Sequence, residues 1–362
     1  MKTIKRIIAL LIILIFLGLV LDGFGDVLLY SRYLYHQYFP GPVKMFLARL
    51  PKQVDHQKYA TQYHDTQKLK YQPIPYTDGG FRLQAGDYGT YHIDAKGRRV
   101  LHVDGLPVAN PHKRLLLLGA SQSFSYYNSD ADSLVAKLAV KLPDYQIDNY
   151  SVPAQPTDMN LLLWKYLNKT QKQHYDLVLV INGPSDLYHI CSNRVLREIQ
   201  NNRTLDQYRQ PALITIPTLL IHKLHPSSKT IPEVCPANQN EQQMAVNSIY
   251  GHFHEVLAYG QTQKVPTLII IPPTPWGTQA NIDNVHFAED FSQPAIYWQV
   301  INQLEQKTAD NKNIIDLSHI YDSSKEQFFL DWAGHLTARG NALLAEKIAL
   351  SVKQWRSPSH DE

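Results

Sequence analysis

Residues 114–123 read Arg-Leu-Leu-Leu-Leu-Gly-Ala-Ser-Gln-Ser, and this stretch decides the fold. A continuous apolar run that ends at Gly119 is typical of a parallel strand covered on both faces. Ser121 then stands on the tight turn after that strand. Near the C-terminus, Asp331 and His335 lie on a short loop before a final helix. Together these three side chains predict a Ser-His-Asp site, which is recognised by the roles of its members and not by their order in the chain.

Downstream of this stretch, short apolar runs alternate with segments of helical spacing. Strands are predicted over residues 114–118, 145–150, 176–181, 266–271 and 313–317, and helices over 132–142, 160–167, 240–264, 293–308 and from Thr337 to about 355. This alternation predicts an α/β fold, a three-layer α/β/α sandwich with a five-stranded parallel sheet. Ligands bind at the carboxyl ends of such strands, where Ser121, residues 182–186 and His335 all fall.

The N-terminus predicts export. Lys2, Lys5 and Arg6 precede an apolar run over residues 7–21. A membrane-spanning helix needs about 20 apolar residues, with about 17 as the lower limit, and this run reaches that limit if Lys5 and Arg6 snorkel. No small-x-small cleavage site follows, so residues 1–22 are predicted to be an uncleaved signal anchor, with a cleaved signal peptide as the alternative. The basic flank stays in the cytoplasm, so either interpretation exports the domain.

The remaining segments are assigned from composition. Residues 23–110 are predicted to form a stalk and an outer layer, in which the turn-rich part 76–110 makes a small antiparallel β-ribbon. Residues 111–356 form the main domain, with an insertion at about 187–240. Residues 357–362 are a polar tail. We expect the insertion to shape one wall of the cleft.

Charge and cysteine content narrow the possible partners. The net charge of +3, without a basic block beyond the N-terminus, argues against nucleic acid. Cys191 and Cys235 are the only cysteines, and outside the cytoplasm such a pair is expected to form a disulfide, with two buried free thiols as the alternative. Two cysteines without a spaced histidine do not predict a metal site, and no cofactor is implied.

The polar residues at the sheet edge suggest nucleophilic catalysis. A serine hydroxyl needs a base within hydrogen-bond reach, and His335 is the candidate base for Ser121. Asp331 would orient and stabilise the imidazole. Candidate oxyanion donors are the N–H groups of Ser121 and Ala154 and a side chain within residues 182–185. Each residue also has an ordinary structural role open to it; Ser121, for example, would serve as a helix N-cap.

The combined pattern resembles the SGNH/GDSL hydrolase superfamily, in particular its exported, membrane-anchored bacterial members, over about residues 90–355. Gly119-Ala120-Ser121 corresponds to the first block, Gly-Asp-Ser, whose serine is the nucleophile. Residues 149–154 correspond to the second block, with Ala154 at the position of the glycine that donates to the oxyanion.

The resemblance continues through two later blocks. Residues 183–186, Gly-Pro-Ser-Asp, correspond to the third block, Gly-x-Asn-Asp, with Ser185 in place of the donating asparagine and Asn182 nearby as a substitute. The last block, Asp-x-x-His, corresponds to Asp331 and His335, with one extra residue between them. The resemblance implies an α/β/α hydrolase fold with Ser121, His335 and Asp331 as the catalytic residues.

Three functions remain open at this stage. The first is an exported serine esterase that removes small acyl groups, such as acetyl, from an envelope or extracellular polysaccharide through an acyl-enzyme at Ser121. The second is a polysaccharide O-acyltransferase that uses the same site. The third is a catalytically degenerate domain that binds glycan or acts as a scaffold. In each case we expect a single-pass protein of the bacterial inner membrane, facing the periplasm or the extracellular space.

Overall fold

The computed structural model describes residues 41–75, 77, 79–103, 112–191, 238–285 and 294–356. The predicted signal anchor and polar tail lie outside the described residues, as do most of the insertion and Cys235 of the predicted disulfide. Within the described ranges, no helix has both the length and the apolar character needed to span a membrane.

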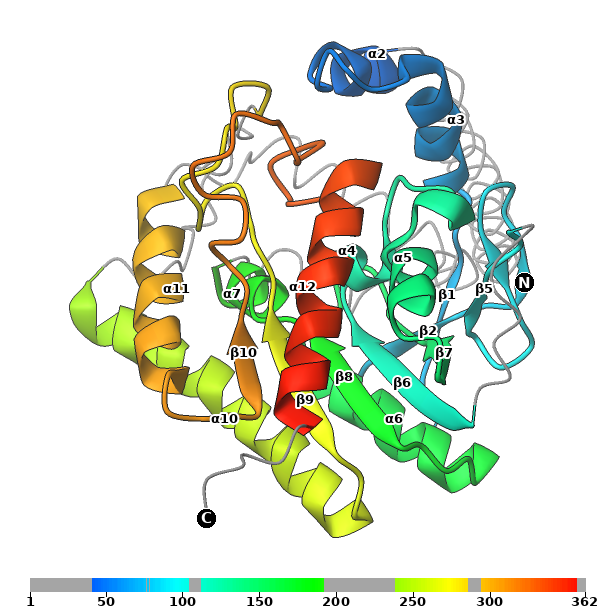
Figure 1. Ribbon diagram of the computed structural model, residues 1–362, viewed down its shortest axis with the longest axis vertical. Coiled ribbons are helices and arrows are strands. Elements are labelled where there is room, and N and C mark those ends of the chain that lie inside the picture. Colours follow the sequence, from blue (N-terminus) through cyan, green and yellow to red (C-terminus); the bar gives the residue numbers. More distant parts are fainter. Residues whose placement is uncertain are drawn as a thin grey trace, which may run out of the picture. The chain divides into compact units, whose positions relative to one another are not determined.

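The centre of the fold is an eight-stranded mixed sheet with the strand order β10-β9-β8-β6-β7-β5-β4-β3 (Figure 1). Its strands are β3 (Gly86–Asp87), β4 (His92–Ile93), β5 (Arg99–Val100), β6 (Lys113–Gly119), β7 (Tyr145–Asn149), β8 (Leu177–Ile181), β9 (Thr267–Ile271) and β10 (Ile314–Asp316). The run β10-β9-β8-β6-β7 is parallel throughout, as predicted. A separate two-stranded sheet pairs β1 (Tyr71–Pro73) with β2 (Phe81–Leu83).

The prediction of a five-stranded, purely parallel sheet was wrong in its extent. The ribbon β3-β4-β5 continues the sheet, because β5 pairs antiparallel with β7 through Arg99 and Asn149. Without the ribbon, β7 would be an edge strand with unpaired N–H and C=O groups, and covering such an edge is a common solution. The ribbon therefore belongs to the main sheet, and its strand β5 lies beside β7, the strand that leads into residues 149–154.

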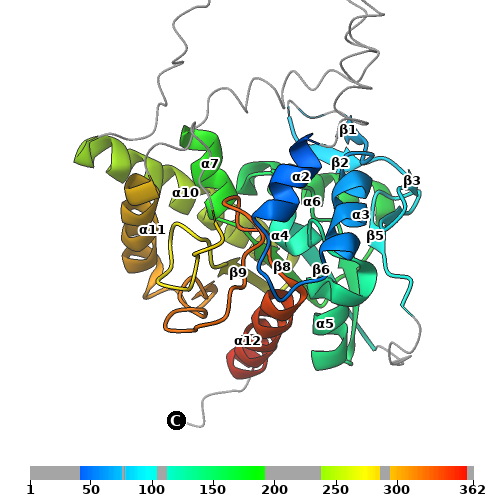
Figure 2. The same cartoon turned by 90° about the horizontal axis from the view of Figure 1, so that it is seen from above.

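Helices cover both faces of the sheet. The helices of the described residues are α2 (Gly41–Ala48), α3 (His56–Thr66), α4 (Ser121–Phe124), the 3-10 turn η1 (Asp130–Asp132), α5 (Leu134–Lys141), α6 (Thr157–Gln171), α7 (Pro184–Cys191), α10 (Gln239–Gln263), α11 (Pro294–Thr308) and α12 (Ala338–Arg356). Helices α5 and α12 share one apolar core, and α6, α7, α10 and α11 share the other (Figure 2). The described residues thus form the three layers that the alternating pattern predicts.

Strand β6 shows why the apolar run is continuous. Leu115 and Leu117 pack into the core under α5 and α12, whereas Leu116 and Leu118 pack into the opposite core, and all four are fully buried. Successive side chains of a strand point to opposite faces, so a strand between two helical layers needs apolar residues at every position. Each buried leucine contributes about 1.5–3 kcal/mol.

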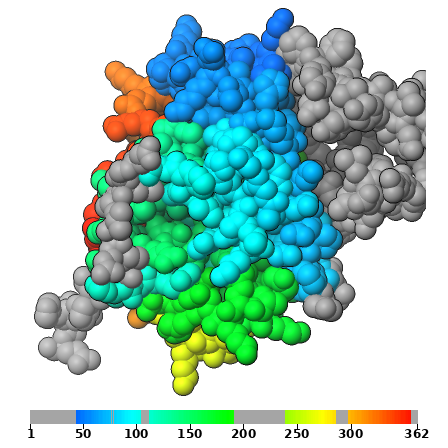
Figure 3. All heavy atoms as spheres, turned by 90° about the vertical axis from the view of Figure 1, so that its right-hand side faces the viewer, coloured from blue at the N-terminus to red at the C-terminus, as the bar shows by residue number. Residues whose placement is uncertain are grey.

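Residues upstream of the ribbon pack as an outer layer. Phe46 on α2 and Tyr59 on α3 share an apolar cluster with Tyr127 and Leu330, which lie on the two loops that carry the candidate site. Figure 3 shows the face on which α2 and α3 (blue) adjoin the ribbon (cyan). This layer therefore braces the loops on either side of the carboxyl edge.

Candidate functional site

Ser121 follows a turn that requires glycine. Gly119 has φ +146°, and a Cβ there would lie 2.3 Å from the carbonyl oxygen of Ile181 on the neighbouring strand. Ala120 is extended, Ser121 begins α4, and Ser123 Oγ donates to the Ala120 carbonyl at 2.9 Å. Ser121 is half-buried. Among the described residues, the Ser121 hydroxyl forms no hydrogen bond with His335 or with any other group.

Asp331 and His335 lie on a tight turn. The Leu330 N–H donates to the His335 carbonyl at 2.7 Å, and Gly334 within the turn has φ +86°. His335 Nδ1 lies 2.6 Å from Asp331 Oδ2, and the His335 N–H donates to Asp331 Oδ1 at 3.2 Å. The turn therefore accommodates the extra residue of the Asp-x-x-x-His spacing. With Nδ1 hydrogen-bonded to the carboxylate, Nε2 lies on the opposite side of the ring.

Gln122 joins the two motifs. Its Nε2 donates to the carbonyl of Gly334, the residue before His335, at 2.8 Å, and to the carbonyl of Pro273 at 2.7 Å. Asn128, further along the loop after α4, donates through Nδ2 to the carbonyl of Leu336 at 2.8 Å. These bonds place the loop that begins at Ser121 directly against the turn that carries His335.

Two tyrosines of the loop after α4 pack against the imidazole of His335. The rings of Tyr126 and Tyr127 lie 4.9 and 5.0 Å from the His335 ring, measured between centroids. Burial raises the pKa of Tyr126 to about 12, so its phenol stays neutral at physiological pH. Phe46 of α2 packs on Tyr127 at 4.6 Å. The Asp331–His335 pair therefore has an aromatic wall on one side, which limits both water and ring rotation.

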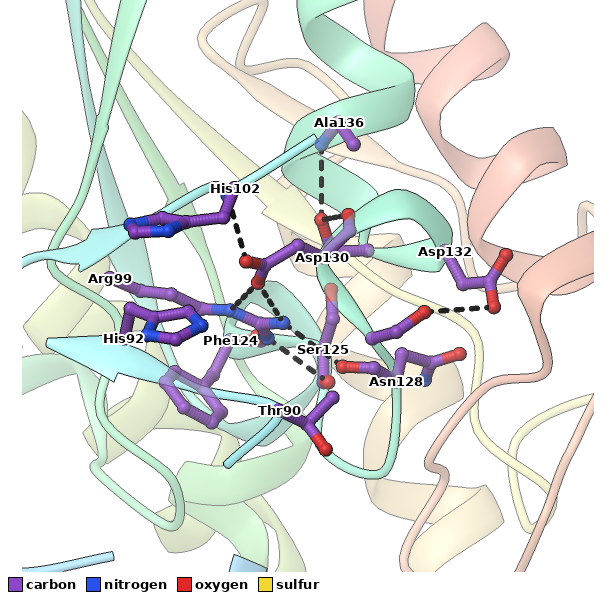
Figure 4. A network of polar contacts seen from close by, with 12 residues as sticks. Thr90, His92, Arg99, His102, Phe124, Ser125, Asn128, Asp130, Asp132 and Ala136 are labelled. Carbon is purple, nitrogen blue, oxygen red and sulfur yellow. Dashed lines mark hydrogen bonds and ion pairs between the residues drawn. The ribbon is translucent and has the colours of Figure 1, made fainter. Parts of the chain in front are cut away.

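Arg99 fixes the shape of the loop after α4 (Figure 4). It lies on β5, is 2% exposed, and donates to the carbonyl groups of Phe124, Ser125 and Asn128 and to the carboxylate of Asp130. Ser125 and Tyr127 in this loop have φ values of +63° and +62°. The guanidinium thus satisfies the carbonyls of a loop whose backbone departs from regular structure.

The candidate oxyanion donors gather at the same edge. Val152 N–H donates to the Gly119 carbonyl at 3.0 Å, which brings the second block beside the Ser121 turn. Ala154 has φ +60°, the left-handed region that favours glycine, and its N–H forms no hydrogen bond within the described residues. Ser185 lies half-buried in the first turn of α7.

Asn182, the alternative third-block donor, uses its side-chain amide in one hydrogen bond of the structure. It is 1% exposed, and its side-chain amide donates to the carbonyl of Gln155 at 2.9 Å. This hydrogen bond ties Asn182 to the residue that follows the second block. The hydroxyl of Ser185, the other third-block candidate, forms no hydrogen bond within the described part of the chain.

The carboxylate of Asp186 links the third block to the start of α6, the helix that follows the second block. Its carboxylate accepts from Thr157 N–H at 3.0 Å, Thr157 Oγ1 at 2.7 Å and Gly183 N–H at 3.2 Å, and it pairs with His252 Nδ1 at 3.2 Å. The hydrogen bond to Asp186 raises the pKa of His252. Asp158 lies close enough to complete a metal-sized cluster. The oxygens of Asp186 already have protein partners, so this cluster is accounted for by packing of the blocks.

The chain is similar to known proteins in structure, and no similarity is found in sequence. No family model matches the chain, and no curated protein matches its sequence. Among solved structures, it is similar to an acetyl xylan esterase at 13% identity and TM-score 0.38, over 66% of this chain and 99% of that one. It is similar to the psychrotrophic esterase EstA from Pseudoalteromonas at 15% identity and TM-score 0.36, over 67% and 98%. A member of the lipolytic G-D-S-L family from Veillonella parvula shows 14% identity and TM-score 0.37, over 67% and 98%.

Some residues of the site carry no signal in the sequence. Gln122, Arg99 and Tyr126 form long-range contacts that no local spacing reveals. His189 follows Ser185 by four residues and so shares a face of α7, a helix that was not predicted from the sequence.

Proposed function

We propose that this protein is an exported serine esterase that forms an acyl-enzyme at Ser121. The observation that carries the proposal is the 2.6 Å hydrogen bond between His335 Nδ1 and Asp331, on a turn that Gln122 ties to the Ser121 loop. An imidazole that donates from Nδ1 to a carboxylate keeps its Nε2 lone pair as a base, and the carboxylate stabilises the imidazolium that forms.

The proposed reaction follows from these groups. Ser121 Oγ attacks the ester carbonyl while His335 Nε2 takes its proton. The oxyanion accepts hydrogen bonds from the N–H groups of Ser121 and Ala154 and from the hydroxyl of Ser185, and each such donor is worth about 3–4 kcal/mol. His335 returns the proton to the departing alcohol. Water, deprotonated by His335, then attacks the acyl-enzyme and releases the acid with Ser121 restored.

For the substrate, we propose a small acyl ester, such as an acetyl group on an envelope or extracellular polysaccharide. The aromatic wall of Tyr126 and Tyr127 beside His335 suits a short acyl chain, and the basic, apolar N-terminus suits a location outside the cytoplasm. The same acyl-enzyme would serve an O-acyltransferase if a sugar hydroxyl replaced water. Incubation with an acetyl donor and a glycan separates the two, since acetylated glycan marks transfer and free acetate alone marks hydrolysis.

Fluorophosphonate labelling of the full-length protein in detergent tests the nucleophile. Wild type should be labelled, and Ser121→Ala and His335→Ala should not. Ser123→Ala is the matched control, because Ser123 lies two residues away and its hydroxyl bonds only the Ala120 carbonyl. It should keep its label. An unlabelled, folded wild type would contradict the proposal and favour a glycan-binding or scaffold role.

A further inference from the structure

Ala154 has a backbone conformation that an alanine rarely adopts. Gln155 N–H donates to the Val152 carbonyl at 3.1 Å, which closes a turn with Pro153 second and Ala154 third. The third residue of a type II turn has positive φ, a position usually taken by glycine, and Ala154 has φ +60°. Its Cβ disfavours this region, so neighbouring contacts must hold Ala154 there.

His189 makes such a contact. Its Nε2 forms a hydrogen bond with the carbonyl oxygen of Ala154, and the side chain is 3% exposed. A carbonyl only accepts, so Nε2 carries the proton and Nδ1 carries a lone pair. Burial lowers the pKa of His189, which favours this neutral form. Nδ1 is buried and has no partner among the described residues. A buried nitrogen without a partner is costly, so the bond at Nε2 is the polar contact that offsets the burial of this ring.

Helix α7 connects this contact to the third block. Ser185 and His189 are four residues apart and therefore share one face of the helix. The face that carries the Ser185 hydroxyl also carries the donor to Ala154. Just before α7, Asn182 holds the next carbonyl, that of Gln155, at 2.9 Å. Residues on either side of the third block thus bind two consecutive carbonyl groups, those of Ala154 and Gln155.

We propose that His189 is a positioning residue that holds Ala154 in the left-handed conformation and so aims the Ala154 N–H at the oxyanion. The proposal rests on the esterase function inferred above. In the structure, the hydrogen bond from His189 to the Ala154 carbonyl is made with Ala154 at φ +60°. A change to negative φ would rotate the preceding peptide plane and turn the N–H away. The histidine thereby lets an alanine do what a glycine does through its conformational freedom.

The first test compares substitutions at His189 in the full-length protein. His189→Phe keeps the ring and removes the donor. We expect kcat for a p-nitrophenyl acetate substrate to fall about 10–100-fold with KM little changed, since the lost interaction exists only in the transition state. His189→Gln, which retains an N–H donor, should lose less. His174→Phe is the matched control on an exposed loop and should keep wild-type kcat.

The second test is rescue by glycine. In the His189→Phe background, Ala154→Gly should recover most of the lost kcat, because glycine adopts positive φ without help. The same substitution in wild type should change kcat little. If His189 only supported packing, glycine at position 154 would not restore activity, and that result would overturn the proposal.

A structural measurement separates this inference from the proposed function. Crystal structures of His189→Phe and His189→Gln should show Ala154 at negative φ in the first and positive φ in the second. A left-handed Ala154 in His189→Phe overturns the inference whether or not the protein is an esterase. A wild type that neither hydrolyses esters nor reacts with fluorophosphonate contradicts the proposed function instead, and the Ala154 conformation still decides whether His189 controls it.

Discussion

Arg99 Nη2 lies 2.9 Å from Asp130 Oδ1 in the interior, and this pair joins the ribbon to the loop that follows Ser121. Both side chains are almost fully buried, and the loop carbonyls accept the remaining Arg99 donors (Figure 4). A strand outside the five parallel strands therefore sets the loop that carries Tyr126 and Tyr127 onto His335.

Replacing Arg99 by methionine should destabilise the fold by about 3–5 kcal/mol, because Asp130 would be left as an unpaired buried charge. Urea unfolding gives this difference. Arg339→Met is the control, since Arg339 and Glu326 form an exposed pair that should contribute less than about 1 kcal/mol. Equal losses of unfolding free energy in the two variants would show that the buried pair stabilises the fold no more than the exposed pair does.

The surroundings of Gly119 and Gly251 predict opposite effects on stability when each glycine is replaced by alanine. Gly119→Ala places a Cβ against the Ile181 carbonyl and Ser123 Oγ at positive φ, and should destabilise by more than about 1 kcal/mol. Gly251→Ala lies inside α10 with no atom within 4 Å of the new Cβ, and should stabilise by about 0.5–1 kcal/mol. Thermal unfolding of both variants measures the signs. A neutral Gly119→Ala would argue against the turn geometry.

Asp331→Asn should lower kcat for ester hydrolysis by about 10³–10⁴-fold, because an amide nitrogen facing Nδ1 favours the wrong imidazole tautomer. Steady-state kinetics with p-nitrophenyl acetate gives the ratio. Glu326→Gln, an exposed carboxylate upstream on the same loop, should leave kcat unchanged. If Asp331→Asn retained wild-type kcat, His335 would not depend on this carboxylate.

His252 predicts a pH-dependent contribution to stability. Its pKa is raised above the ordinary 6.5, chiefly by the hydrogen bond to Asp186. The folded state therefore binds the proton more tightly than the unfolded state, so the stabilisation is fully present below about pH 6.5 and is lost as pH rises through the raised pKa. The difference in urea midpoint between wild type and His252→Gln should be larger near pH 5.5 than near pH 8.5. A difference independent of pH would mean that the proton plays no part.

Much of the fold follows from local pattern. The apolar run at residues 114–118 became β6, and Thr337 precedes α12 and caps it, with its hydroxyl accepting from Gly340 N–H at 3.1 Å. These elements are predictable because period, length and capping act over a few residues. The attachment of β5 to β7 was not predictable, because a two-residue strand carries no period and its pairing depends on an edge formed by distant residues.

The sequence by itself determined the strand–helix alternation, the order of the candidate motifs and their common edge, since these depend on side-chain period and on the rule that parallel strands end together. Only the tertiary structure decided that Asn182 donates to the Gln155 carbonyl and that His189 bonds the Ala154 carbonyl. Those outcomes depend on hydrogen bonds of fixed length and direction between segments far apart in the chain. No spacing encodes them, because each arises only after the strands and helices have packed.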